Sequence, residues 1–219
     1  MLLNPKKEYE NKMELDIIQN EVKIRAGLKR DKRLVRTKKA IVFSLMELMK
    51  TKELDRITVT ELTNRADVNR KTFYLHYECV ADVLEDFADD LVYYLGEVMK
   101  RSRSESGEIS FDDFFAIVSA TIEQNLDFFR AFSRSEAYNA INSEKKKDMT
   151  ASLHRALFGY FKDGDLSSRY KLEFILSGVL GLYNSWLFDE APILSAAEIG
   201  VCAATMCKRA LGSYGGDRA

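Results

Sequence analysis

Residues 56–77 read RITVTELTNRADVNRKTFYLHY, and the order of polar and apolar side chains in this stretch decides the fold. Thr58 is followed three residues later by Glu61, the pattern of a capping box. In such a box the threonine accepts from the third-residue amide and the glutamate reaches back to the cap amide. We therefore expect a helix to begin near residue 59, with Leu62 and Ala66 facing inward.

A tight turn follows this helix. The helical pattern stops at Asp67 and Val68, and Asn69 is a favourable N-cap for a helix that starts at Arg70. Two short helices joined by a turn of about three residues form a helix-turn-helix. The second helix of such a motif presents its N-terminal residues to the major groove of DNA.

A third helix is expected upstream, over residues 34–50. Its apolar residues recur at helical spacing, and basic residues occupy the rest of its surface. The apolar positions are Leu34, Ile41, Leu45 and Leu48. The sequence therefore predicts a small three-helix unit over residues 34–80.

The whole chain is expected to be all-α. Its 219 residues are 46% hydrophobic and 31% charged, which excludes a disordered chain, and two prolines leave long helices uninterrupted. A helix over residues 80–103 is followed by a serine-rich linker at 102–110. Further helices are expected at 111–125, 126–135, 143–162, 169–189 and 195–211. We assign residues 1–33 to an N-terminal extension and 81–219 to a helical regulatory and dimerisation domain.

The charge is distributed in blocks. Residues 1–22 hold 3 basic and 5 acidic residues (net −2), and residues 23–77 hold 15 and 6 (net +9). Residues 78–219 hold 15 and 23 (net −8). A basic block joined to an acidic body favours a polyanion as the partner of one end. The alternative interpretation is a solvated basic helix face.

The segment quoted above resembles the DNA-binding signature of the TetR/AcrR family of one-component transcriptional regulators, in the variant whose recognition helix reads N-R-x-T-F-Y-x-H-Y. The match covers about residues 34–95. The resemblance implies that Arg70 and Lys71 reach base edges or phosphates, unless they form only a solvated helix start. It also implies that Thr72, Tyr74 and His76 donate to phosphate oxygens. Thr58 or Thr60 would hold a phosphate at the preceding helix, and Asn69 completes the predicted DNA-binding set. Phe73 is expected in the core instead.

Two positions depart from the family pattern. Asp67 stands where glycine is usual, so the turn needs a left-handed aspartate, which has some energetic cost. Val80 replaces a lysine that is frequent in the family, and Glu78 and Asp82 lie nearby. Losing one phosphate contact lowers the salt slope of DNA binding by about 0.9.

The N-terminal extension is either an extra helix or a disordered segment. Its basic end would suit an arm that reaches the phosphate backbone or a minor groove. The arm residues we single out are Arg30, Lys32, Arg33 and Arg36. A solvated basic helix is the competing interpretation.

The last two expected helices, at about 170–188 and 195–211, are rich in apolar and small residues. They would form either a homodimer face, paired as a four-helix bundle, or a buried core hairpin. The resemblance also implies a homodimer and a ligand pocket. Aromatic side chains of the body form the core, and a subset of them would line a pocket for a small apolar effector. That subset is Phe115, Phe132, Phe158, Tyr183 and Trp186.

Several classes of protein are excluded by what the sequence lacks. The chain has two histidines, and its three cysteines lack the paired spacing of a zinc site. We therefore expect neither a structural metal nor a cofactor. The sequence contains neither a nucleophile elbow nor a phosphate-binding glycine loop, so no motif in it indicates an enzyme. No stretch reaches the roughly 18 to 20 apolar residues of a membrane span. An odd cysteine count without an apolar leader favours the cytoplasm.

The sequence therefore predicts a homodimeric regulator that binds a double-stranded DNA operator, acting as a repressor released by a small-molecule effector. The competing hypothesis is a protein-interaction adaptor or co-activator that keeps this fold but binds DNA weakly or not at all.

Overall fold

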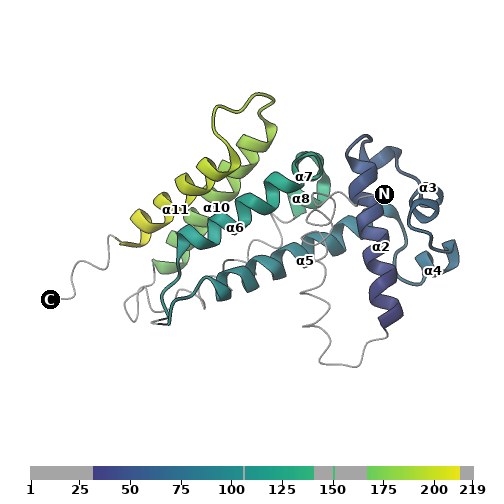
Figure 1. The fold of residues 1–219 in the computed structure, drawn as a ribbon, viewed down its shortest axis with the longest axis horizontal. Helices are drawn as coiled ribbons and strands as arrows, with labels where there is room; N and C mark the ends of the chain where they lie inside the picture. Colours follow the sequence, from purple (N-terminus) through teal and green to yellow (C-terminus); the bar gives the residue numbers. More distant parts are fainter. Residues whose placement is uncertain (1–31, 106, 141–149, 151–166, 213–219) are drawn as a thin grey trace, which may run out of the picture. The chain divides into compact units, whose positions relative to one another are not determined.

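The fold was analysed in a computed structural model, which describes residues 32–105, 107–140, 150 and 167–212 (Figure 1). Every regular element among them is helical, apart from an isolated β-bridge between Arg103 and Ile109. The all-α prediction is confirmed for this part of the chain. The N-terminal extension up to residue 31 and the expected helix at 143–162 lie outside the described residues, except for Thr150.

The chain divides into two compact units. The first, here called the head, ends at Tyr94 and also contains Asp127–Tyr138. The second, here called the body, takes Leu95–Leu126 and the residues from Asn139 onward. The domain boundaries drawn from the sequence stay a prediction.

The head begins with α2 (Lys32–Met49), followed by a short 3-10 helix η2 (Leu54–Arg56). Next come α3 (Val59–Arg65), α4 (Arg70–Tyr74) and the first part of α5 (Val80–Arg101). Helix α3 packs against both α2 and α4. The apolar stripes of these helices form one core, because Ile41, Leu45, Leu62, Phe73, Val83 and Leu84 are almost fully buried.

A cluster of aromatic rings extends this core. Phe87 on α5 contacts Phe128 and Phe132 of α7 (Leu126–Ser133), with ring centroids 5.0 and 5.4 Å apart and the rings nearly perpendicular. A short helix α8 (Glu136–Ala140) follows, and its Tyr138 packs on the edge of Phe132. Edge-to-face pairs of this kind stabilise a core beyond the area they bury.

The body contains the end of α5, then α6 (Phe111–Gln124), α10 (Ser168–Phe188) and α11 (Ala196–Gly212). Helix α11 packs against both α6 and α10, as Figure 1 shows for these neighbouring ribbons. The approach of α6 to α11 is close at Gly200, because a Cβ built there would lie 2.5 Å from Ser119 Oγ and 3.0 Å from the Phe115 carbonyl oxygen. A larger residue at position 200 would require Ser119 to move and α6 and α11 to separate slightly.

Candidate nucleic-acid interface

The helix-turn-helix begins with a threonine cap. The Glu61 amide donates to Thr58 Oγ1 at 3.1 Å, so α3 starts at Val59 as the sequence predicts. Glu61 differs from the capping-box expectation in one respect, because its carboxylate pairs with Lys52. The α3 cap therefore depends on Thr58, and the Glu61 side chain ties α3 to the segment before η2.

The turn between α3 and α4 contains the one non-glycine residue of the described chain that has a positive φ. Asp67 lies at φ 52°, which is the left-handed conformation expected of it. The Val68 amide donates to the Thr63 carbonyl oxygen at 3.0 Å and closes the turn. Asn69 then caps α4, since its side chain accepts from the Lys71 amide at 2.8 Å.

Helix α4 separates its side chains into a buried and an exposed set. Phe73 is 0% exposed and packs in the head core, as predicted. The exposed set contains Asn69, Arg70, Lys71 and Tyr74, while Thr72 and His76 are half-buried. Thr58 and Thr60 at the start of α3 are exposed as well. The fold therefore leaves every predicted DNA-binding side chain at least partly accessible to a ligand.

Arg70 and Tyr74 form a pair on the exposed side of α4. The Arg70 guanidinium carbon lies 5.9 Å from the centre of the Tyr74 ring, and Arg70 Nη2 donates to the Tyr74 hydroxyl at 3.4 Å. Residues four apart on a helix face each other, so this contact is local to α4. The sequence analysis did not predict it.

A polar cluster fixes the segment after α4 to α2 and α5. Asp86 Oδ2 on α5 accepts from the Tyr77 hydroxyl at 2.8 Å and from Lys38 Nζ of α2 at 2.7 Å. Lys38 also lies over the Tyr77 ring, 5.3 Å from its centre. These residues are 48 positions apart at the widest separation, so no local sequence signal could identify the cluster.

His76 lies beside this cluster. Partial burial lowers the pKa of His76, Lys38 lowers it further, and Asp86 acts in the opposite direction. The neutral imidazole is therefore favoured near pH 7, where it can offer one N–H donor.

The amides at the start of α5 are already occupied. Asp82 Oδ2 accepts from the Glu78 amide at 2.7 Å and from the Cys79 amide at 3.2 Å. The Cys79 thiol and these backbone hydrogen bonds lower the pKa of Asp82 and keep it ionised. The Asp82 carboxylate therefore occupies the position that a phosphate would take against these amides. This agrees with the sequence analysis, in which Val80 replaces a lysine and Asp82 lies nearby.

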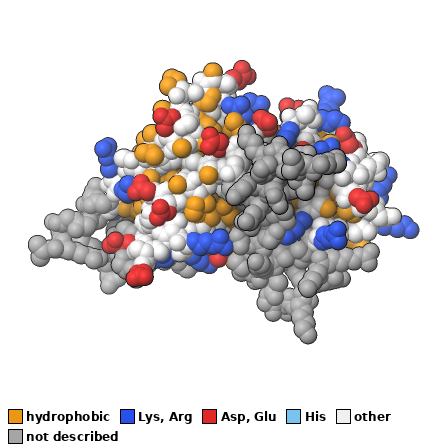
Figure 2. All heavy atoms as spheres, in the orientation of Figure 1, with side chains coloured by type: hydrophobic (Ala, Val, Ile, Leu, Met, Phe, Trp, Pro, Cys, Tyr) orange, Lys and Arg blue, Asp and Glu red, His pale blue; other side chains and the backbone are white. Residues whose placement is uncertain are grey.

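Of the predicted arm residues, Arg36 is exposed on α2. Lys32 and Arg33 belong to the first turn of α2, so that part of the extension is helical. Arg30 lies outside the described residues. Figure 2 shows Lys and Arg side chains on the visible face of the helices that form the head. Two basic side chains of the head are partly neutralised, because Lys52 pairs with Glu61 and Arg65 pairs with Glu47.

The predicted effector-pocket residues are distributed between the two units. Phe115 and Tyr183 stack in the body with ring centroids 6.3 Å apart, and Trp186 Nε1 donates to the Leu194 carbonyl oxygen at 2.7 Å. Phe132 belongs to the head, where its ring packs on Phe87 and Phe128. Phe158 lies outside the described residues.

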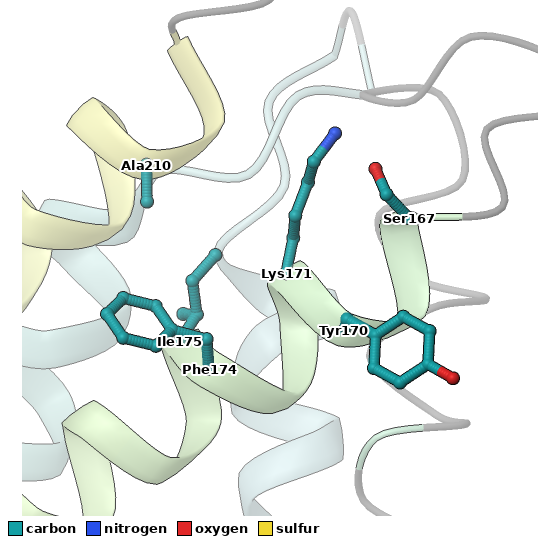
Figure 3. A pocket seen from close by; sticks show the side chains of 6 residues that line it. All are labelled: Ser167, Tyr170, Lys171, Phe174, Ile175 and Ala210. Carbon is teal, nitrogen blue, oxygen red and sulfur yellow. The ribbon is translucent and has the colours of Figure 1, made fainter.

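The body has a surface hollow at a different place. It has a volume of about 370 Å³ and is lined by Ser167, Tyr170, Lys171, Phe174, Ile175 and Ala210 (Figure 3). In Figure 3 the side chains come from the first turns of α10, together with Ala210 of α11. The sequence analysis assigned none of these residues to a pocket.

An apolar face runs along α10 and α11. Phe174 is 76% exposed and Val201 is 63% exposed, and Tyr170, Phe188 and Met206 are exposed too. Figure 2 shows hydrophobic side chains on the visible surface of this part of the body. A large exposed apolar patch marks an interaction surface.

Other site classes have no counterpart in the described residues. Within them, no group of three or more His, Cys, Asp or Glu side chains is arranged to hold a metal ion. The cysteines at 79, 202 and 207 are free thiols. Among the helices that the structure describes, none is both long and apolar enough to span a membrane.

Comparison with known proteins places the fold. No protein-family model matches the sequence, and no curated protein matches it. Three solved structures illustrate the similarity. The dihydroxyacetone kinase operon activator DhaS has a TM-score of 0.62 at 11% identity, over 81% of this chain and 97% of that one. A TetR regulator from Streptococcus agalactiae 2603V scores 0.53 at 22% identity, over 82% and 98%.

The third is SmeT, the repressor of the Stenotrophomonas maltophilia multidrug efflux pump SmeDEF, with a TM-score of 0.58 at 17% identity, over 81% of this chain and 89% of that one. Similarity at these identities concerns the arrangement of helices, and it extends over nearly the whole length of each relative. The chain therefore has the fold of the TetR-family transcriptional regulators.

Proposed function

We propose that this protein is a homodimeric, sequence-specific DNA-binding transcriptional regulator that represses its target genes and is released from DNA by a small apolar effector. The observation that carries the proposal is the division of α4, in which Phe73 anchors the helix in the core while Arg70, Lys71 and Tyr74 remain exposed. This is the arrangement that a recognition helix needs in order to enter a major groove.

Arg70 and Lys71 have the strongest claim to base contacts, because they occupy the first turn of α4. Arginine to guanine is the commonest specific pairing between a side chain and a base. Thr58, Thr60, Thr72, Tyr74 and His76 offer hydroxyl or imidazole donors, which would set the register on the phosphate backbone. Lys32, Arg33 and Arg36 would add phosphate contacts.

The dimer is proposed to form through the exposed face of α10 and α11. A second copy would cover Phe174 and Val201, which otherwise remain in water. Two heads held in this way would meet half-sites about one helical turn apart, roughly 34 to 36 Å. The effector part of the proposal is supported by the aromatic side chains inside the body, where Phe115 and Tyr183 stack.

The test starts from the full chain and a library of randomised DNA duplexes. Duplexes retained by the protein are sequenced, and the affinity of the best one is measured by fluorescence anisotropy at several salt concentrations. We expect one enriched motif with two related halves, and an affinity that falls steeply with salt because phosphate contacts release counterions. Absence of enrichment, or affinity that ignores salt, would contradict the proposal.

A double variant connects the result to α4. Arg70→Ala with Lys71→Ala should abolish enrichment of the motif, while Lys100→Ala with Arg101→Ala removes the same charge from exposed positions at the end of α5 and should keep it. A reporter gene placed behind the motif then measures the direction of regulation, and repression is expected.

The adaptor hypothesis has one observation in its favour, namely that Asp82 occupies the Glu78 and Cys79 amides at the start of α5. An adaptor would enrich no duplex, and capture of its protein partner would be unchanged in the Arg70 and Lys71 double variant.

A further inference from the structure

We propose that Tyr74 is a positioning residue for Arg70, so that the two side chains act together as one specificity determinant. The inference rests on the proposed function and names the way in which the recognition helix would present its arginine. It assigns to the Tyr74 ring a task that differs from donating a hydroxyl to a phosphate.

The geometry of the pair carries the inference. The Arg70 guanidinium lies over the Tyr74 ring at 5.9 Å from its centre, and its Nη2 reaches the Tyr74 hydroxyl at 3.4 Å. The hydrogen bond occupies one terminal nitrogen of the guanidinium. An arginine side chain has five N–H donors in a planar fork, so most of its edge remains available to a base.

The Tyr74 ring is itself held in place by the core of the head. It meets the ring of Phe73 edge-on, with centroids 5.5 Å apart and planes at 87°. Phe73 is fully buried, whereas Tyr74 is 50% exposed. The contacts therefore lead from the head core through Phe73 and Tyr74 to the exposed Arg70.

This support matters because a free arginine side chain samples many rotamers. Contact with the fixed Tyr74 ring restricts those rotamers before DNA arrives, and less freedom is then lost when the fork meets a guanine edge. The hydrogen bond to Tyr74 uses one terminal nitrogen, and the remaining guanidinium donors can pair with guanine O6 and N7, so both contacts can exist at once.

The two roles require different parts of the Tyr74 side chain. A phosphate donor needs the hydroxyl, and its loss weakens binding to all duplexes alike because phosphates carry no sequence information. A positioning residue needs the ring, and its loss weakens discrimination only at the base pair that Arg70 reads. Phenylalanine and leucine substitutions separate these outcomes.

The experiment uses the full chain, the best duplex selected from a randomised library, and a set of duplexes that each change one base pair. Affinities are measured at one salt concentration for the wild type, Arg70→Ala, Tyr74→Phe, Tyr74→Leu and the double variant Arg70→Ala with Tyr74→Leu. Phe43→Leu, which replaces an exposed aromatic residue of α2, is the matched control. Circular dichroism checks each fold, and Tyr74→Met replaces Tyr74→Leu if the latter does not fold.

Arg70→Ala identifies the base pair whose replacement no longer costs affinity. At that pair we expect Tyr74→Leu to reduce discrimination about three- to fivefold, and Tyr74→Phe to change it by less than about twofold, because a phenyl ring still stacks. The double variant should match Arg70→Ala alone, and Phe43→Leu should match the wild type.

Three results would overturn the inference while leaving the proposed function intact. They are an equal loss on every duplex with Tyr74→Leu, an equal loss with Tyr74→Phe and Tyr74→Leu, and independent additive effects of Tyr74→Leu and Arg70→Ala. If the wild type selects no duplex, the proposed function fails and the inference fails with it.

Discussion

The Tyr77 hydroxyl donates to the Asp86 carboxylate at 2.8 Å, which links the segment after α4 to α5. Because Asp86 also accepts from Lys38, one carboxylate connects three parts of the head. Tyr77→Phe should lower the free energy of unfolding by about 0.5 to 1.5 kcal/mol, through loss of one hydrogen bond.

Asp86→Ala should cost more than Tyr77→Phe, since it leaves both the Tyr77 hydroxyl and the Lys38 ammonium without this acceptor. Urea unfolding followed by circular dichroism measures both changes. Equal stability of Tyr77→Phe and the wild type would show that the hydrogen bond contributes nothing.

The turn residue Asp67 has a left-handed backbone at φ 52°. Asp67→Gly should leave stability unchanged or raise it by up to about 1 kcal/mol, because glycine adopts this conformation without steric cost. Asp67→Val should lower stability by about 1 to 3 kcal/mol, since a β-branched residue is strained there. Thermal unfolding compares the variants.

Glu53→Gly is the control for the Asp67 variants, because Glu53 has an ordinary φ of −66°. Glycine at that position only increases the conformational entropy of the unfolded chain, so about 0.5 to 1 kcal/mol of stability should be lost. If Asp67→Val proved as stable as Asp67→Gly, the left-handed turn would be wrong.

Gly200 lies where α11 meets α6. Gly200→Ala should destabilise the protein by about 1 to 3 kcal/mol, because the new methyl group would overlap Ser119 Oγ at 2.5 Å and press on the Phe115 carbonyl oxygen. Gly96→Ala is the matched control, since a Cβ there meets nothing within 4 Å. It should stabilise α5 by about 0.5 to 1 kcal/mol. Differential scanning calorimetry shows whether each variant is less or more stable than the wild type.

The phenol of Tyr183 is buried and shares a 2.7 Å hydrogen bond with Ser119 Oγ. Burial raises the pKa of Tyr183 from 10.0 to about 12. The folded state therefore holds this proton more tightly than the unfolded state does. The resulting stability is fully present below pH 10 and is lost as the pH rises from about 10 to 12.

Urea unfolding midpoints measured across this pH window test the assignment. Tyr183→Phe should lower stability at neutral pH, because the Ser119 hydroxyl loses its partner, and its midpoint should fall less between pH 10 and 12 than that of the wild type. An identical decline in both proteins would mean that Tyr183 is not the group responsible.

Phe174 occupies the exposed apolar face of α10. If a second copy covers this face, Phe174→Arg would bury a charge in the dimer, and about half of the wild-type mass is expected in sedimentation equilibrium at micromolar concentration. Phe43→Arg introduces the same charge at an exposed aromatic residue of the head and should leave the mass unchanged. A wild-type protein that sediments as one chain at every concentration would refute the proposed dimer.

Local chemistry explains which parts of the head could be predicted from the sequence. The caps at Thr58 and Asn69 each depend on a hydrogen bond to an amide two or three residues away, so sequence spacing alone identified both helix starts. Phe73 was predicted to be buried and is. The short elements η2 and α8 were not predicted, because neither is long enough to show a helical period.

Features that depend on distant segments could not be predicted. The Lys38, Tyr77 and Asp86 cluster joins residues 48 positions apart, and no residue type in it is unusual. The packing of Phe132 in the head is another such feature, because aromatic content does not reveal the unit in which a ring packs. The predicted DNA contacts, pocket and dimer face stay predictions until the measurements above are made.

Helix α4 has only five residues, too few to hold its shape without the anchor that Phe73 provides. The exposed side chains of α4 contribute much less to the packing of the core than Phe73 does. If α4 reads DNA as proposed, substitutions at positions 70 and 71 would change the target preference while the scaffold persists, and gene duplicates of this protein would acquire new binding sequences in single mutational steps.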